Sequence, residues 1–181
     1  VNCCHAFLPK LLPRGDGHIV NMSSMLGFVG VPNQSAYVST KFAIRGFTES
    51  LWAELDGTDI AVTGIYPGTI QSDILQRASF SDEREKAAMM KMMDRFGIPA
   101  SDVARKTVNA IRRDRREVII GRDAIALVAP KRFLPGLGHR LGLALDLRGD
   151  GGGKVDALDA HAESERRAPG SHAVLDLQPP G

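Results

Sequence analysis

Two short apolar segments, separated by one long helical segment, constrain the fold of this chain more than any other feature. Residues 17–23 read Gly-His-Ile-Val-Asn-Met-Ser, and residues 60–66 read Ile-Ala-Val-Thr-Gly-Ile-Tyr. Apolar runs of this length, bounded by turn residues, are typical of buried strands. The order strand, helix, strand predicts a right-handed crossover between two parallel strands.

The segment between these strands predicts one long helix over residues 36–55. Its apolar residues cover more than one face, which predicts burial on both sides, by the sheet and by another helix; they are Tyr37, Phe42, Ile44, Phe47, Leu51, Trp52 and Leu55. We further expect helices over 1–12 and 101–111, one or two surface helices over 71–96, and a third short strand over 118–121. The fold class is therefore α/β with a parallel sheet.

Charge, cysteine positions and histidine spacing argue against several classes of partner and site. The formal net charge is +2, which gives no argument for a nucleic-acid partner or an acidic membrane surface. Cys3 and Cys4 are adjacent and cannot form a disulfide framework, so we expect a reducing, cytoplasmic location. The apolar stretch 124–145 is interrupted by charged residues and prolines, so no transmembrane segment is expected. The five histidines lack the spacing of metal ligands, and no metal site is expected.

Ser24, Tyr37 and Lys41 are the candidate catalytic residues. Residues four apart share a helix face, so the Lys41 ammonium would lie near the Tyr37 phenol and favour its ionised form. The Ser24 hydroxyl, just after the first strand, could hydrogen-bond a carbonyl or alkoxide oxygen. Together these groups suit proton transfer at an oxygen while a hydride leaves or reaches the attached carbon. Taken alone, the pair Tyr37 and Lys41 is more often a buried tyrosine beside a lysine that reaches for solvent.

The surrounding sequence decides between these interpretations. The run Gly17 to Ser24, followed by Gly27, Gly30, Pro32, Tyr37, Lys41 and Pro67-Gly68, closely resembles the short-chain dehydrogenase/reductase family over roughly residues 1–145. The resemblance implies a partial Rossmann-like parallel sheet flanked by helices. It places a domain at residues 1–147, and we expect the Gly-rich segment 148–181 to be a disordered tail.

The resemblance also implies a role for each candidate residue. Tyr37 would be the catalytic acid/base, Ser24 would hold the substrate oxygen, and Lys41 would tune Tyr37 and bind the nicotinamide ribose. The cofactor, NAD or NADP, would be contacted by Tyr37, Lys41 and the loop residues Pro67, Gly68, Ile70 and Ser72, with Ser72 standing where members usually have Thr. The implied reaction interconverts an alcohol and a carbonyl on a small, lipophilic substrate. The 36–55 helix would pair subunits in a homo-oligomer.

One departure from the family pattern bears on activity. No Gly-rich turn between a strand and a helix precedes Ser24, although such a turn normally meets the cofactor pyrophosphate. The chain also begins at Val1 without an initiator Met. We therefore expect that the N-terminal Gly-rich cofactor half is absent from this chain and that the fragment alone is inactive. A different class of function stays open, namely a truncated, non-catalytic fragment that acts only as an oligomerisation or binding module.

Overall fold

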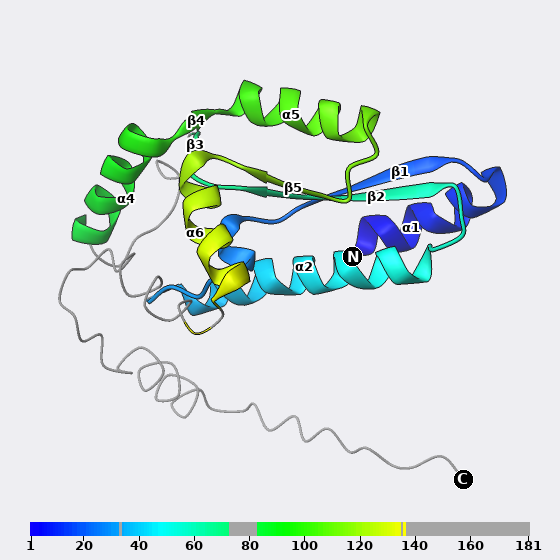
Figure 1. The fold of residues 1–181 in the computed structure, drawn as a ribbon, viewed down its shortest axis with the longest axis horizontal. Helices are drawn as coiled ribbons and strands as arrows, with labels where there is room; N and C mark the ends of the chain where they lie inside the picture. Colours follow the sequence, from blue (N-terminus) through cyan, green and yellow to red (C-terminus); the bar gives the residue numbers. More distant parts are fainter. Residues whose placement is uncertain (33, 73–82, 135, 137–181) are drawn as a thin grey trace, which may run out of the picture. The chain divides into compact units, whose positions relative to one another are not determined.

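The computed structural model describes residues 1–32, 34–72, 83–134 and 136 of the 181-residue chain. Helices and strands alternate along this part of the chain (Figure 1), as an α/β fold requires. The elements are α1 (Asn2–Leu11), η1 (Leu12–Arg14), β1 (Gly17–Met22), η2 (Met25–Gly27), α2 (Ser35–Glu54), β2 (Ile60–Pro67), β3 (Ile70–Gln71), α4 (Glu83–Phe96), β4 (Ile98–Pro99), α5 (Ala100–Arg112), β5 (Glu117–Ile120) and α6 (Arg122–Phe133).

Strand β2 is the centre of a three-stranded parallel sheet with the order β1-β2-β5. It pairs with β1 from Gly17↔Ile60 to Met22↔Ile65, and with β5 from Gly64↔Glu117 onwards. The carboxyl ends of β1 and β2 therefore lie side by side at one edge of the sheet. This confirms the predicted fold class, a parallel sheet flanked by helices.

The helices cover both faces of this sheet (Figure 1). Helices α1 and α2 pack on one face, where Ile19, Leu51 and Val62 belong to one buried cluster. Helix α5 packs on the other face, where Ile65, Val103 and Ile120 are buried together. Alternate residues of β2 thus point to opposite layers, as expected for a strand that is buried on both sides.

Most of the predicted elements are confirmed within one or two residues at their ends. The features that were not predicted are helix α6, the short helices η1 and η2, and the two-residue parallel pair of β3 with β4, in which Ile70 lies opposite Ile98. Residues 73–82, part of the predicted surface helices, and the predicted tail at 148–181 lie outside the described residues. No helix in the described ranges is both long and apolar enough to span a membrane.

The prediction that the 36–55 helix is buried on both sides is wrong for a single chain. In α2, only Thr48 and Leu51 are buried, and Tyr37 and Phe42 are exposed by 45% and 39%. The reason is that the sheet covers one side of α2, where Phe47 and Trp52 pack against the buried cluster, while Tyr37 and Phe42 remain exposed in the described part of the chain. Part of the wide apolar arc of α2 is therefore exposed instead of buried against a second helix.

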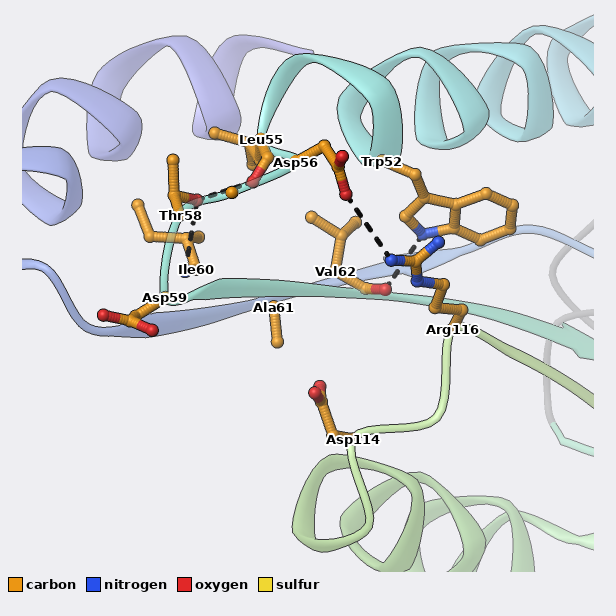
Figure 2. A pocket seen from close by; sticks show the side chains of 11 residues that line it. Trp52, Leu55, Asp56, Thr58, Asp59, Ile60, Ala61, Val62, Asp114 and Arg116 are labelled. Atoms are coloured by element: carbon orange, nitrogen blue, oxygen red, sulfur yellow. Dashed lines mark hydrogen bonds and ion pairs between the residues drawn. The ribbon is translucent and has the colours of Figure 1, made fainter.

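The Trp52 side chain covers the first part of β2, which does not pair with β5. Pairing with β5 begins at Gly64, so the edge of β2 before it lies outside that ladder. Trp52 of α2 donates its indole N–H to the Val62 carbonyl oxygen at 2.9 Å, which satisfies a strand carbonyl from the neighbouring helix. A cavity of about 250 Å³ lies at this edge and is lined by Trp52, Val62 and charged residues that include Asp114 and Arg116 (Figure 2).

Gly27 allows the turn after β1 to lie directly against α2. A Cβ at this position would meet Ser23 Oγ at 2.7 Å and the Lys41 carbonyl oxygen at 3.0 Å. The second of these neighbours is helix backbone, which cannot turn aside. The absence of a side chain at Gly27 therefore sets how closely η2 approaches α2.

We predict that Gly27→Ala lowers the free energy of unfolding by about 1–3 kcal/mol, because the added methyl group must push η2 away from the α2 backbone. Chemical denaturation followed by circular dichroism measures the change. Gly30→Ala is the matched control, since a Cβ at Gly30 meets nothing within 4 Å. Equal stability of the two variants would contradict the close approach.

Tyr66 is fully buried near the carboxyl end of β2. Its ring packs edge-on against Phe28 with the centroids 4.8 Å apart, and the phenol lies where a side chain at Gly64 would stand. Among the described residues, its hydroxyl has no hydrogen-bond partner. Burial, together with the negative charges of Glu117 and Glu49, raises the pKa of Tyr66 to about 12, although Arg45 opposes the shift.

We predict that Tyr66→Phe raises the free energy of unfolding at neutral pH by about 1 kcal/mol, because it removes a buried polar group that lacks a partner. In the parent protein, the folded state keeps the Tyr66 proton between its ordinary pKa of 10.0 and about 12, while the unfolded chain releases it. Stability therefore falls as the pH rises through this window, and the variant lacks this part of the fall. Denaturation midpoints measured across the window check both statements, and a less stable variant would contradict the first.

Candidate active site

Ser24 begins the turn that follows β1. The neighbouring Ser23 extends the strand ladder by donating its N–H to the Ile65 carbonyl oxygen at 2.8 Å. Ser24 then caps η2, since its Oγ accepts a hydrogen bond from the Leu26 N–H at 3.2 Å. This leaves the Ser24 hydroxyl proton available to another acceptor. Ser24 is only 8% exposed, so the turn holds its hydroxyl below the surface.

The turn after β1 is fixed to α2 at Lys41. Ser23 Oγ donates a hydrogen bond to the Lys41 carbonyl oxygen at 2.8 Å, across the gap that Gly27 keeps open. The Ser23 hydroxyl is therefore engaged with the backbone in a structural role. The bond sets the position of the following Ser24 relative to the helix that carries Tyr37 and Lys41.

Tyr37 and Lys41 face the same side of the first turns of α2. The Lys41 ammonium nitrogen lies 5.4 Å from the centroid of the Tyr37 ring. Partial burial lowers the pKa of Lys41 below its ordinary value, because the surrounding protein disfavours the charged form. Tyr37 is 45% exposed, so its phenol is open to a ligand from outside. The arrangement places one cation beside one accessible phenol.

The second group of candidate residues follows β2. Pro67 ends the strand, and Gly68 donates its N–H to the Ile120 carbonyl oxygen at 2.7 Å. Ile70 is held in the β3–β4 pair, and Ser72 lies half-buried just beyond it. Ser24 and the loop from Pro67 to Ser72 thus follow neighbouring strand ends, while Tyr37 and Lys41 lie on α2, to which the Ser23 hydroxyl ties the turn after β1.

Sequence reasoning missed Asp123, which contacts the loop after β2. Its Oδ2 accepts a hydrogen bond from the Thr69 N–H at 2.6 Å. The partners are 54 residues apart in the chain, so no local pattern could pair them. An acidic residue in the first turn of a helix, two residues after the Gly121 that follows a strand, was the available signal.

The described residues fit the nicotinamide end of a dinucleotide. Lys41 offers a partly buried ammonium group, and Thr69 Oγ1 is buried in the loop after β2 without a hydrogen-bond partner among the described residues. The backbone of the same loop adds donors and acceptors near a sheet edge, where open α/β sheets bind ligands. For the pyrophosphate, the printed sequence offers no Gly-rich turn before Ser24.

Two cavities in the described part of the chain do not include the candidate catalytic residues in their linings. One is the cavity at the start of β2 in Figure 2, at the opposite end of that strand from Pro67. The other, of about 360 Å³, is lined by ionic side chains of α2, β5 and α6, among them Arg45, Glu117 and Lys131. Neither includes Ser24, Tyr37 or Lys41 in its lining.

Comparisons with known proteins bear on the family and the fold. The short chain dehydrogenase family matches residues 1–83. SadH from Mycobacterium tuberculosis is 37% identical over 145 residues, which are 78% of this chain and 52% of that protein, so the chain spans about half the length of this relative. Among solved structures, a short chain dehydrogenase/reductase from Burkholderia phymatum in complex with NAD has a TM-score of 0.63 at 22% identity, over 74% of this chain and 52% of the other. A short chain dehydrogenase from Burkholderia cenocepacia in complex with NADP has the same TM-score and identity, over 78% and 53%.

The family match begins at residue 1 and includes all the residues expected to contact the cofactor, which are Tyr37, Lys41, Pro67, Gly68, Ile70 and Ser72. The expectation that the cofactor half is absent is therefore corrected, because the match places part of the family's cofactor region within this chain. The sequence match and the parallel α/β fold together lead to one conclusion: the chain belongs to the short-chain dehydrogenase/reductase family.

Proposed function

We propose that this chain carries the Ser24, Tyr37 and Lys41 site of an oxidoreductase that interconverts an alcohol and a carbonyl with NAD or NADP. The observation that carries the proposal is the Lys41 ammonium 5.4 Å from the Tyr37 ring, on a helix to which the Ser23-Ser24 turn is hydrogen-bonded. A cation and a phenol on one helix, and a hydroxyl just after a neighbouring strand, are the groups that this chemistry needs.

In the reduction direction, Tyr37 donates its phenolic proton to the substrate oxygen. A nicotinamide held by the loop after β2 and Lys41 would supply the hydride for the carbonyl carbon. The positive charge of Lys41 stabilises the phenolate that Tyr37 leaves behind. Ser24 donates its hydroxyl proton to the same substrate oxygen and so holds it beside Tyr37. In the oxidation direction, the Tyr37 phenolate takes the proton back.

The loop after β2 would hold the nicotinamide. The Ile70 backbone and the Ser72 hydroxyl would contact its carboxamide, while Lys41 would hydrogen-bond the attached ribose. The NAD and NADP named for two structures of the same fold support this class of cofactor, and the choice between the two stays open. The printed sequence has no Gly-rich turn before Ser24 that could bind the pyrophosphate of the cofactor. We therefore propose the activity for a protein in which a further segment, beside residues 1–147, binds the pyrophosphate.

The substrate is proposed to be a small, lipophilic alcohol or ketone. The sequence 41–51, Lys-Phe-Ala-Ile-Arg-Gly-Phe-Thr-Glu-Ser-Leu, resembles family members that act on such compounds. The proposal includes no nucleic-acid partner, because the net charge is only +2.

Tyr37→Phe tests the proposed mechanism. We predict that it removes most of the turnover, by about 100-fold or more, because phenylalanine has no proton to donate. The dissociation constant for NAD(H) or NADP(H) should stay nearly unchanged, since the ribose contact of Lys41 remains. Steady-state kinetics and a fluorescence titration of the reduced cofactor measure the two quantities.

The chain offers a matched control, because Tyr37 and Tyr66 are its two tyrosines. Tyr66→Phe makes the same chemical change at a buried residue outside the proposed site and should leave turnover unchanged. A Tyr37→Phe protein that keeps a near-normal rate would overturn the mechanism. A loss of turnover in both variants would point instead to a general effect on the fold.

We also propose that a second copy of the chain covers the outward face of α2. The proposed contact is centred on Phe42, which is 39% exposed and whose ring centroid lies 5.5 Å from the Lys131 ammonium of α6, and it leaves the Tyr37 phenol open to the substrate. Apolar surface of this kind is commonly buried in symmetric dimers. Light scattering in solution should give at least twice the mass of one chain. A monomer at micromolar concentration would contradict this part of the proposal.

A further inference from the structure

A carboxylate holds the loop that follows β2. Asp123 lies in the first turn of α6, and its Oδ2 accepts a hydrogen bond from the Thr69 N–H at 2.6 Å. The preceding loop residue, Gly68, donates its N–H to the Ile120 carbonyl oxygen at 2.7 Å. Two consecutive residues of the loop are therefore tied to the end of β5 and the start of α6.

Two glycines make room for this carboxylate. A Cβ at Gly68 would overlap both Asp123 carboxylate oxygens, and a Cβ at Gly121 would overlap Oδ1. Gly121 also has a φ of +118°, a backbone conformation that residues with side chains rarely adopt. Loop and carboxylate are thus in direct contact, and the loop cannot move towards α6 without displacing Asp123.

The polar atoms at this contact are not fully paired. Asp123 Oδ1 and Thr69 Oγ1 are both buried and have no hydrogen-bond partner among the described residues. A buried carboxylate oxygen without a partner is costly, and stability alone would favour a neutral side chain here. The partial positive charge at the N-terminus of α6 offsets part of this cost. The presence of a carboxylate here therefore indicates that the position of the loop matters more than the stability lost at this contact.

We infer that Asp123 is a positioning residue that fixes Gly68 and Thr69 in the conformation that receives the nicotinamide end of the cofactor. The inference rests on the proposed function, in which the loop after β2 contacts that group. Asp123 itself touches neither cofactor nor substrate. Without it, the Thr69 N–H loses its acceptor, and the cofactor must order the loop on binding, which lowers the apparent affinity.

Asp123→Ala tests the inference in the protein expressed from its complete coding region. The Thr69 amide hydrogen should exchange with solvent faster than in the parent protein, which hydrogen-exchange measurements detect. The dissociation constant for the reduced cofactor should rise about tenfold, the effect of losing one charge-assisted hydrogen bond. The KM for the cofactor should rise with it, whereas kcat should fall less, because Tyr37 is untouched.

Three further variants separate positioning from a general effect on folding. Asp123→Asn keeps an oxygen that can accept from the Thr69 N–H and should restore most of the affinity. Asp102→Ala removes an acidic residue from the first turn of α5, where Asp102 pairs with Arg105, and should change neither amide exchange at Thr69 nor cofactor affinity. Gly68→Ala keeps the Asp123 carboxylate but adds a methyl group that collides with it. This change should push the loop away from Asp123 and weaken cofactor binding. If Asp123→Ala does not fold, the Asn and Gly68 variants still decide the question.

The outcomes distinguish this inference from the proposed function. If the parent protein binds NAD(H) or NADP(H) and Asp123→Ala binds it equally well, the positioning role is overturned and the proposed function stands. If Asp123→Ala speeds amide exchange at Thr69 but leaves the dissociation constant for the cofactor unchanged, the positioning role is likewise overturned. If the parent protein binds neither cofactor, the proposed function fails, and the inference fails with it.

Discussion

The register of β2 between its two neighbours is the constraint on which the rest of the structure depends. Because Met22 lies opposite Ile65, the turn after β1 and the loop after β2 emerge from the same edge of the sheet. Because β5 pairs with the last residues of β2, its own end lies beside that loop, and α6 starts there. A shift by one residue would exchange the faces of β2, burying Thr63 where Val62 now packs and separating both groups of candidate residues.

Polar contacts then fix the turn after β1 and the loop after β2 to the helices beside them. Ser23 binds the Lys41 carbonyl group, and Gly27 lets the turn approach closely, so Ser24 is set by a backbone contact instead of by its own side chain. Asp123 does the equivalent for the loop after β2. In both places, a neighbouring residue holds the backbone of the segment that is proposed to contact the ligand, and the Ser24 hydroxyl, which accepts from the Leu26 N–H, keeps its proton available.

The sequence was enough to predict the main elements and the pair Tyr37 and Lys41, because both depend on local periodicity. Apolar runs between turn residues mark β1 and β2, and a spacing of four places two side chains on one helix face. Helix α6 was harder to predict, since Pro130 interrupts its pattern in the last turn. The β3–β4 pair and the Asp123 contact depend on segments that are far apart in the chain and meet only after folding. The exposure of α2 was misjudged because periodicity shows which residues are apolar and not what covers them.

The indole that closes the edge of β2 has a practical consequence. Trp52 is the single tryptophan of the sequence, and its N–H bond to the Val62 carbonyl group joins the end of α2 to the start of β2. Its fluorescence emission is therefore an intrinsic reporter of the separation of this helix from this strand. The indole also lines the cavity at the start of β2, so its emission would respond directly to a molecule bound there, whereas a molecule bound at the loop after β2, at the far end of the strand, could change it only through motion of the strand or helix.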